Sequence, residues 1–365
     1  MERDSTYDKS QFKPKARLLW GMMGLLLFLV AWMVPSGKSI GNSAPVLRSR
    51  DAAFDIGTGA DAIIFNVSNK AMNLPRVFVL PMNDLPCPVP NEQNFRTETD
   101  EDGTVHSIYE DKTIKVDCYT FWYSNPDTEG VMHDSLIYAA KVKIAHPTQL
   151  RTAFAGGEFG TERRMPSEIA RSVNAVVSIN GDFYNYGQRS GMCIRQGTVY
   201  REGPDGKEVL FIDSNGDFSF AGSQQAYDMR FYALDSPDYS GKKYYQCLNF
   251  GPTLVRDGEI LHPNSVPEMC KLRGPRSAIG QTGPLEYVLV AVAGRRIDGV
   301  FYYGMNTYTL AEMMHNVLGC TQAYNLDGGQ SSVLTFHNKP YSLLSNGDER
   351  PFGDIIFFAT ADPEN

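Results

Sequence analysis

Short runs of apolar and β-branched residues, separated by turn residues, recur through most of the chain and predict strands. They span residues 113–123, 135–145, 209–213, 286–294 and 353–361. The Asn215-Gly216 pair predicts a hairpin between residues 212 and 220, because a type I′ turn needs positive φ at both central positions. Asp213, Asn215 and Asp217 also resemble the start of a calcium loop. That loop needs a glutamate at its twelfth position, which is missing, so we favour the hairpin.

Two stretches predict helices. Pro166 suits the first turn of a helix over residues 166–173, where its missing N–H is not needed. A second helix is indicated by an apolar stripe with helical spacing, formed by Leu310, Met313, Met314, Val317 and Leu318. Gly319 is a suitable end for this helix. Thr309 and Glu312 match a capping box at its start, which explains Glu312 better than a catalytic role does.

A buried strand is expected after each predicted helix, over residues 175–179 and 322–326, and each strand ends in Asn-x-Asp. The pairs are Asn180 with Asp182 and Asn325 with Asp327. Because strand side chains alternate, each pair can present two polar groups on one face. One sequence leaves open whether these units are an internal repeat or a coincidence. Together the patterns predict an α+β fold, with a twisted mixed β-sheet and a few packed helices.

The N-terminal part follows another pattern, with 17 uncharged and mostly apolar residues from Leu18 to Val34. This length suffices for one N-terminal transmembrane helix, and the basic residues Lys13, Lys15 and Arg17 before it favour a cytoplasmic N-terminus. We therefore expect a single-pass type II membrane protein with an extracytoplasmic catalytic domain. A cleaved signal peptide and a buried core helix are the alternatives. The anchor is favoured because the run exceeds the usual core of a signal peptide.

Four parts follow from these patterns: a short cytoplasmic tail (1–17), a transmembrane signal anchor (18–34), a loop-rich stem (35–104) and a catalytic domain (105–361). The stem begins with residues rich in Gly, Ser, Ala and Asp, which suit a flexible linker. A cluster of prolines then disfavours helices and central strands. Order is therefore expected to begin near residue 104.

Composition and charge narrow the choice of partners. The net charge is −8 with acidic residues spread along the chain, so nucleic acid is not an expected partner. Six cysteines lie on the expected exported side: Cys87, Cys118, Cys193, Cys247, Cys270 and Cys320. Disulfides can persist there, but free buried cysteines remain an equal alternative. The absence of any CxxC motif argues against a structural zinc site.

The segment NLDGGQSS (325–332) carries the strongest candidate chemistry. Asp327 follows an apolar strand, and Gly328 and Gly329 allow the backbone to approach a ligand closely. A tight turn with a capping aspartate is the plainer interpretation. Arg276 is suited to bidentate phosphate binding, with a surface salt bridge as its alternative. Neither Gly-x-Ser-x-Gly nor a glycine-rich phosphate loop is present, which argues against serine hydrolases and nucleotide kinases.

Six segments, in this order, resemble the phosphodiester glycosidase domain. They are INGDFY (179–184), FGPTLVRDGEI (250–260), RGPRSAIGQT (273–282), LAEMMHNVLGC (310–320), NLDGGQSS (325–332) and NGDERP (346–351). The resemblance covers roughly residues 135–361, and its strength lies in the register of the motifs. Two positions depart from the family, which often has glycine where Asp182 and Gln330 stand.

The resemblance implies hydrolysis of a sugar-1-phosphodiester, such as one of N-acetylglucosamine, to free sugar and a phosphomonoester. Because the phosphomonoester is a good leaving group, the cleft mainly needs an anion clamp and a carboxylate. We assign Arg276 as the clamp, Asp327 as the first choice for base or nucleophile, and Asp182 as the second. The expected substrate-binding residues are Asn180, Asn325, Gly328, Gly329, Ser331 and Arg350. Asn180 and Asn325 are expected to orient sugar hydroxyls.

Several questions stay open at the level of sequence. Bacterial relatives and the predicted anchor suggest a role in cell-envelope or exopolysaccharide metabolism. An oxygen-lined site of this kind can also hold Ca²⁺ or Mg²⁺. The alternative functions are a non-catalytic protein that binds an envelope glycan, and a phosphodiesterase that cleaves the P–O bond instead.

Overall fold

The structure is a computed structural model that describes much of the chain from Val79 onward. The described residues are 79–80, 85–126, 129–182, 184, 191–222, 225, 243–261, 268–297 and 299–362. The predicted cytoplasmic tail and anchor (1–34) lie outside the described residues, as does most of the predicted stem. Among the residues that are described, no helix is long and apolar enough to cross a membrane.

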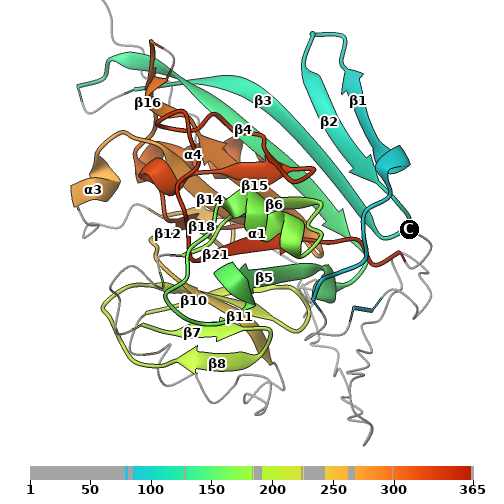
Figure 1. The fold of residues 1–365 in the computed structure, drawn as a ribbon. Coiled ribbons are helices and arrows are strands. Elements are labelled where there is room, and N and C mark those ends of the chain that lie inside the picture. Colours follow the sequence, from blue (N-terminus) through green and yellow to red (C-terminus); the bar gives the residue numbers. More distant parts are fainter. Residues whose placement is uncertain are drawn as a thin grey trace, which may run out of the picture. The chain divides into compact units, whose positions relative to one another are not determined.

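The largest element is a nine-stranded sheet with the order β1-β2-β3-β4-β15-β14-β18-β12-β13 (Figure 1). Its strands are β1 (Phe95–Thr99), β2 (Val105–Glu110), β3 (Ile114–Pro126), β4 (Met132–Ile144), β15 (Glu286–Val292), β14 (Arg276–Gly283), β18 (Gln322–Leu326), β12 (Thr253–Arg256) and β13 (Glu259–Ile260). The long strands β3 and β4 pair along their whole length, from Ile114 with Ile144 to Pro126 with Met132.

Two five-stranded sheets and a two-stranded ribbon complete the β-structure of the described residues. One sheet contains β20 (Lys339–Pro340), β19 (Leu334–Phe336), β6 (Val177–Asn180), β21 (Asp354–Phe358) and β5 (Leu150–Phe154). The other contains β10 (Phe218–Ala221), β9 (Val209–Asp213), β11 (Tyr244–Asn249), β7 (Cys193–Arg195) and β8 (Thr198–Arg201). The ribbon pairs β16 (Gly294–Ile297) with β17 (Val300–Tyr303).

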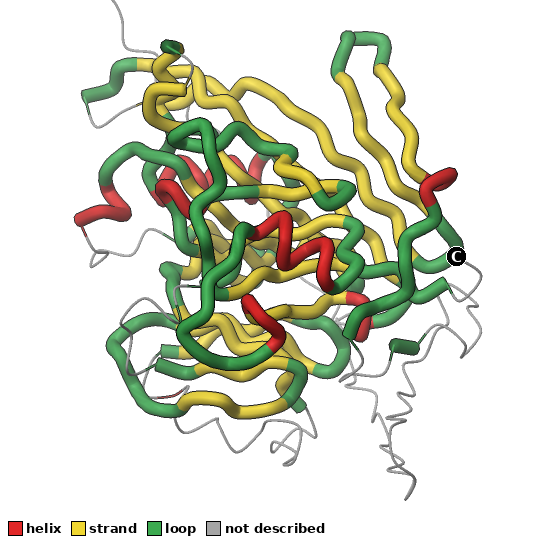
Figure 2. The backbone as a smooth tube through the Cα atoms, in the orientation of Figure 1, coloured by secondary structure: helices red, strands yellow, loops and turns green. Residues whose placement is uncertain are grey.

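The described helices are few, as Figure 2 shows. They are α1 (Pro166–Ser172), α3 (Glu268–Lys271) and α4 (Thr307–Asn316), with the 3-10 turns η2 (Glu92–Asn94), η3 (Pro147–Gln149), η4 (Ala155–Gly157) and η6 (Gly329–Ser331). The prediction of a β-rich fold with a few packed helices is confirmed. The prediction of a mixed sheet is wrong, because every pairing between described strands is antiparallel.

Alternation along the strands explains how these elements form layers. In β15, Tyr287, Leu289 and Ala291 point to the core shared with the five-stranded sheets, whereas Val288 and Val290 point to the core under α4. Both faces of this strand are buried after its first residue, Glu286, so its sequence is apolar from Tyr287 to Val292. Helix α1 covers the outer face of β5 and β21. The layers therefore run from α4 through the nine-stranded sheet and the sheet of β6 to α1.

Helix α4 begins three residues earlier than the predicted capping box, because its N-cap is residue 306 instead of residue 309. Asn306 is its N-cap, and the Asn306 side chain accepts a hydrogen bond from the Thr309 N–H at 2.9 Å. Thr309 and Glu312 therefore do not form the predicted box, because an asparagine was available at the true start. The predicted end is confirmed, since Gly319 has a φ of +74° just beyond the helix.

The hairpin between β9 and β10 is confirmed, with Phe218 opposite Ile212. Its turn is not type I′, because Gly216 has positive φ but Asn215 does not. Instead, the Asp213 carboxylate accepts hydrogen bonds from the N–H groups of Asn215 and Asp217 at 2.8 and 3.0 Å. All six cysteines are buried and none forms a disulfide, so the alternative without disulfides holds in this structure.

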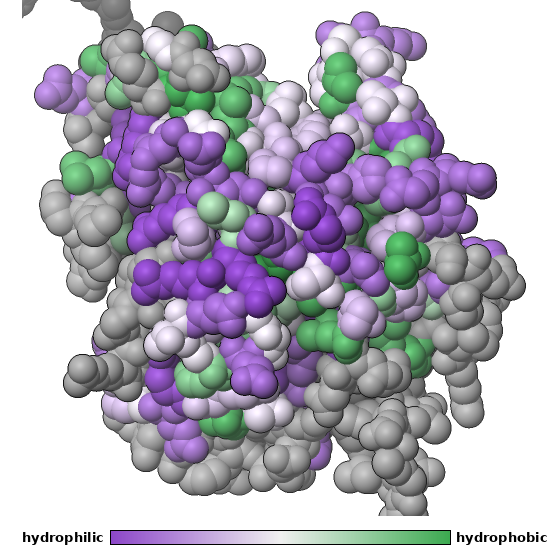
Figure 3. Space-filling view, in the orientation of Figure 1, coloured by the Kyte–Doolittle hydropathy of each residue, from purple (hydrophilic) through white to green (hydrophobic). Residues whose placement is uncertain are grey.

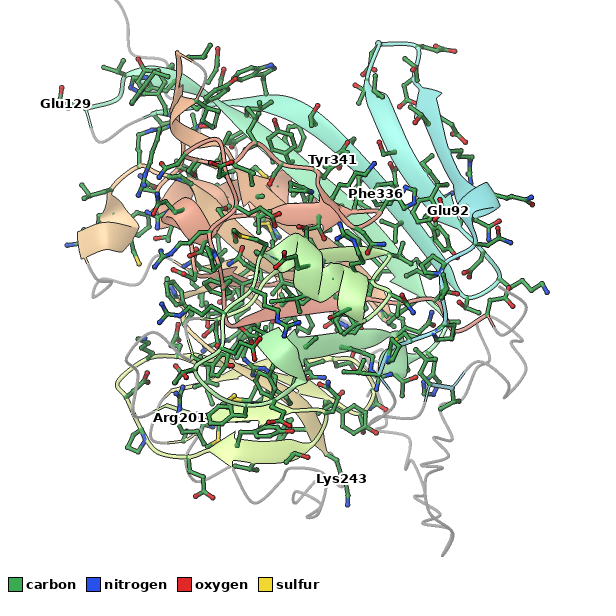
Figure 4. The ribbon with its side chains drawn as sticks, in the orientation of Figure 1. Glu92, Glu129, Arg201, Lys243, Phe336 and Tyr341 are labelled. Carbon is green, nitrogen blue, oxygen red and sulfur yellow. The ribbon has the colours of Figure 1, made fainter. Side chains whose placement is uncertain are left out.

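The folded part begins before residue 104, contrary to the prediction. Strand β1 already pairs with β2, and the Phe95 ring stacks on His337 with centroids 3.8 Å apart. The Glu92 carboxylate lies 2.8 Å from Nε2 of His337, and Phe95 meets Phe336 edge-on. Figure 4 shows Glu92, Phe336 and Tyr341 on the same side of the molecule. These aromatic contacts were not visible as a pattern in a loop-rich segment.

Hydrophilic side chains cover much of the described surface in the view of Figure 3, including the middle of the face over α1. Apolar residues of α1 such as Ile169 and Ala170 are buried against β21 instead. The helix therefore turns one face to solvent and one to the sheet, as an amphipathic helix should.

Candidate functional site

The two predicted Asn-x-Asp strand ends meet in space. Strand β6 belongs to a five-stranded sheet and β18 to the nine-stranded sheet, yet the Asn180 side chain donates to the Asp327 carbonyl at 2.7 Å. The Asn180 side-chain oxygen accepts from the Ser277 hydroxyl at 2.7 Å and from the Val333 N–H at 3.2 Å. Both polar atoms of the Asn180 amide are hydrogen-bonded to protein groups, and these hydrogen bonds connect the two sheets. Asn180 is therefore poorly placed to orient a sugar hydroxyl.

Three glycines allow neighbouring segments to close on the backbone of Gly274 and Pro275. A Cβ added at Gly294 would lie 2.5 Å from the Pro275 nitrogen, and one at Gly328 would lie 2.7 Å from the Pro275 oxygen. A Cβ at Gly304 would clash with the Gly274 backbone. Only glycine permits such approaches. The ribbon β16–β17 and the turn after Asp327 are thereby fixed against the start of β14.

Asp327 is the most unusual carboxyl group of the site. It is only 9% exposed, and its Oδ2 atom is buried without a hydrogen-bond partner in the described part of the chain. Burial raises its pKa to about 6, and the charge of Asp182 acts in the same direction. A hydrogen bond from Ser331 and the charge of Arg350 oppose this shift of the pKa. A buried carboxyl group with an open oxygen is a strong candidate for a functional group.

The turn after Asp327 is held by polar contacts on the solvent side. The Ser345 hydroxyl donates to the Gly329 carbonyl at 3.1 Å, and an Arg350 Nη1 lies 3.5 Å from the Ser331 hydroxyl. Glu349 accepts hydrogen bonds from the N–H and hydroxyl of Ser167 at the start of α1, at 2.8 and 2.5 Å. The loop that carries Arg350 is therefore tied to α1. The structure brings Ser331 and Arg350 beside Asp327, and their role in substrate binding stays a prediction.

Beneath this turn lies a buried ion triad that the sequence did not predict. Arg195 on β7 is 2% exposed, and its Nη2 lies 2.7 Å from Asp354 on β21 and 3.2 Å from Asp182. The same guanidinium donates to the carbonyls of Ile194 and Cys247. Burial raises the pKa of Asp354, while Arg195 opposes that shift. The sequence carried one signal for this triad, because Arg195 and Asp354 are charged residues within the otherwise apolar strands β7 and β21.

Asp182 is fully engaged by the protein, which argues against its predicted place as second-choice base. One of its oxygens accepts from the Tyr184 N–H at 3.1 Å and faces Arg195, and the other accepts from the Asn249 N–H at 2.8 Å. Its role is to position the loop after β6. Among the two aspartates, only Asp327 has an open oxygen.

Several other buried polar atoms around Asp182 lack partners within the described residues. They are Oδ1 of Asn325, Oδ1 of Asp354, and both side-chain polar atoms of Asn249. The Asn325 amide donates to the Gly251 carbonyl at 2.7 Å, which leaves its oxygen open. Buried polar groups are nearly always hydrogen-bonded, so this concentration marks a place where a polar ligand or water completes the structure. Asn325 thus keeps its candidacy as a substrate-binding residue.

Arg276 lies at the start of β14, but its guanidinium is directed to backbone carbonyls. Its Nε donates to Met305 at 2.9 Å and its Nη2 to Leu272 at 2.6 Å. Burial lowers the pKa of Arg276. Arg276 therefore connects the backbone segments of Met305 and Leu272, a structural role that differs from the predicted binding of phosphate.

Two other predictions bear on the boundaries of the site. Glu312 lies on α4. The pKa of Tyr123 on β3 is raised first by the burial of Tyr123 and then by the negative charge of Glu312. This places Glu312 near β3 instead of the Asp327 turn, in line with a non-catalytic role.

Among the described residues, no three His, Cys, Asp or Glu side chains form a group that could hold a metal ion. Ca²⁺ or Mg²⁺ at this site stays a prediction.

Comparisons with known proteins bear on the same region. A family model described as phosphodiester glycosidase matches residues 173–359, just over half of the chain. The SPbeta prophage-derived uncharacterized protein YomE of Bacillus subtilis (strain 168) is 27% identical over 218 residues, or 56% of this chain and 31% of that protein. The chain therefore spans about a third of the length of this curated relative.

A solved structure has the same fold. It is the catalytic domain of zebrafish N-acetylglucosamine-1-phosphodiester alpha-N-acetylglucosaminidase, auto-inhibited by its pro-peptide. The TM-score is 0.56 at 18% sequence identity, and the match covers 73% of this chain and 88% of that chain.

Replacing Arg195 with methionine should strongly destabilise the protein. The change leaves Asp182 and Asp354 buried without their shared cation, which costs about 3–5 kcal/mol of unfolding free energy. The matched control is Arg164→Met, which breaks the exposed ion pair with Glu162 and should change stability little. Denaturant unfolding of both variants measures the difference. Equal effects would show that the triad does not stabilise the fold.

Proposed function

The chain belongs to the phosphodiester glycosidase family of hydrolases, and we propose that it hydrolyses an N-acetylglucosamine-like sugar-1-phosphodiester. The products are the free sugar and a phosphomonoester. The observation that carries this proposal is the Asp327 carboxyl group, which lies where the ends of β6 and β18 meet. One of its oxygens is buried and has no hydrogen-bond partner among the described residues. Its surroundings combine this group with the hydroxyl of Ser331 and the charge of Arg350.

In the proposed reaction, Asp327 acts in its ionised form as a general base on water or as a nucleophile at the anomeric carbon. The bond between that carbon and the phosphate oxygen breaks, and its electron pair leaves with the phosphomonoester. Water supplies the hydroxyl group of the released sugar. Because a phosphomonoester is a stable anion, the departing oxygen needs little help from a general acid. Asn325, with its open oxygen, is the protein group best suited to accept a sugar hydroxyl.

The proposed setting is outside the cytoplasm, in cell-envelope or exopolysaccharide metabolism. This part of the proposal rests on the apolar run at residues 18–34 and the basic residues before it. Protease added to intact cells should remove the part after residue 35 and leave a protected N-terminal fragment. A chain that stays whole under these conditions, but is cut after lysis, would contradict the exported location.

Product analysis tests the reaction. The full-length protein, given an N-acetylglucosamine-1-phosphodiester, should release free sugar and phosphomonoester. Sugar-1-phosphate would indicate P–O cleavage, and no turnover across several sugars would indicate a glycan-binding protein. Asp327→Asn should lower kcat/KM by about 10²–10⁴-fold, because the carboxylate that takes the proton is lost. Asp102→Asn, in the exposed turn between β1 and β2, is the matched control. Full activity of Asp327→Asn would refute the assignment.

The pH dependence follows from the raised pKa of Asp327. If its ionised form is the active one, kcat/KM should rise as the pH increases through about 6 and then level off. Folding stability should change in the opposite direction. The folded state holds the proton more tightly, so the unfolding free energy should fall by up to roughly 3 kcal/mol between the ordinary carboxyl pKa and about 6.

Both slopes can be measured separately. A kcat/KM profile that falls through pH 6 would show that the protonated carboxyl is the active form. Denaturant unfolding at several pH values gives the stability slope, which Asp327→Asn should reduce because its amide does not titrate. An unchanged stability slope in that variant would assign the titration to another group.

A further inference from the structure

The ribbon β16–β17 carries an arginine to the glycine turn that follows Asp327. An Nη2 atom of Arg295 lies 3.4 Å from the position that a Cβ would take on Gly329. Gly329 itself has a φ of +68° and opens the short turn η6. A Cβ at this position would be in ordinary van der Waals contact with the guanidinium. The absence of one leaves room between Arg295 and the backbone of the turn.

Arg295 has open donors, unlike the other arginines around the start of β14. Arg276 donates to the carbonyls of Met305 and Leu272, and Arg273 donates to backbone carbonyls and a serine hydroxyl. Arg195 is buried between two carboxylates. The Arg295 side chain is exposed. It makes no hydrogen bond, ion pair or ring contact within the described residues.

The backbone of Arg295 is held in an unfavourable conformation. Its φ is +71°, in the left-handed region that residues other than glycine, asparagine and aspartate rarely adopt. The ribbon is fixed at both ends, because Gly294 packs on Pro275 and Gly304 packs on Gly274. Strain of this kind persists where the surrounding structure imposes it, and it is concentrated at functional sites.

The register of the ribbon fixes the face from which Arg295 projects. Arg295 lies opposite Tyr302, so their side chains share one face. Tyr302 packs against the main core and stacks on Trp122, with ring centroids 6.2 Å apart. The neighbours Phe301 and Tyr303 are exposed on the other face. The side chain of Arg295 therefore emerges on the side of the ribbon that faces the domain and the Asp327 turn.

The geometry points to Arg295 as the residue that binds the phosphate group of the substrate. This inference rests on the proposed function and names a different residue from the predicted clamp, Arg276. A guanidinium with open, parallel N–H groups suits two oxygens of a phosphodiester. When the bond to the sugar breaks, negative charge grows on the phosphate oxygen that leaves. A cation fixed in place beforehand stabilises that charge in the transition state.

The test uses Arg295→Gly in the full-length protein, because glycine accepts the positive φ without strain. We expect kcat/KM for a sugar-1-phosphodiester to fall by about 10²–10³-fold, as for the loss of a preorganised electrostatic donor. Inhibition by inorganic phosphate should weaken at least about tenfold. Turnover of an aryl glycoside of the same sugar, which lacks phosphate, should be unchanged. The midpoint of unfolding should not decrease.

Asn338→Gly is the matched control, since Asn338 also has positive φ (+59°) but lies in the turn between β19 and β20. It should retain phosphate inhibition and both activities. Equal losses on the phosphodiester and the aryl glycoside, or unchanged phosphate inhibition, would overturn the assignment of Arg295. If the unchanged protein hydrolyses neither substrate, the proposed function fails. Calorimetric binding of inorganic phosphate, lost in Arg295→Gly but kept in Asn338→Gly, would then still support the phosphate site.

Discussion

The buried guanidinium of Arg195 is the contact on which the arrangement of the site depends. It joins β7 in one five-stranded sheet to Asp354 on β21 in the other, and it also reaches Asp182 in the loop after β6. The Asp354 carboxylate fills the space where a Cβ at position 181 would lie, so Gly181 is required there. The backbone at Gly181 is thereby held against Asp354. The preceding residue, Asn180, donates from its side-chain amide to the backbone of Asp327.

The charged groups of this region differ between the interior, which holds the carboxylates of Asp182 and Asp354, and the surface, which carries arginines. Two carboxylates, those of Asp182 and Asp354, share one buried guanidinium. Burial raises the pKa of Asp354 and the charge of Asp182 acts in the same direction, while the charge and hydrogen bond of Arg195 oppose this rise. The charge of Asp182 also contributes to the raised pKa of Asp327. An anionic substrate cannot approach such a region without cations on the outer side. Arg350 and Arg295 lie on that side of the Asp327 turn.

Much of the fold was predictable because its strands carry local signals. The run at residues 286–294 alternates between two buried faces, and the Asn-x-Asp endings identified β6 and β18 as strands that stop at a polar region. Their meeting across two sheets was not predictable, because strand pairing depends on contacts distant in sequence. The cap of α4 was misplaced for a local reason: Asn306 and Thr309 both suit a helix start, and the side chain of Asn306 makes the capping hydrogen bond.

The residues of the site were predicted only in part, because the sequence does not show which charged side chains bind other protein groups. Arg276 was assigned to phosphate because a guanidinium suits that anion, and Asp182 was chosen because it ends a strand in Asn-x-Asp, yet both side chains bind protein groups. Arg195 and Asp354 looked like ordinary strand residues, although a charge in an apolar strand must be paired when it is buried. The two positions that depart from the family pattern, Asp182 and Gln330, also differ in whether the side chain binds a protein group within the described part of the chain. Asp182 supplies a partner for Arg195, whereas Gln330 lies half-buried in η6 beside the open turn. Gln330 is therefore the departure that can alter which substrate the turn accepts.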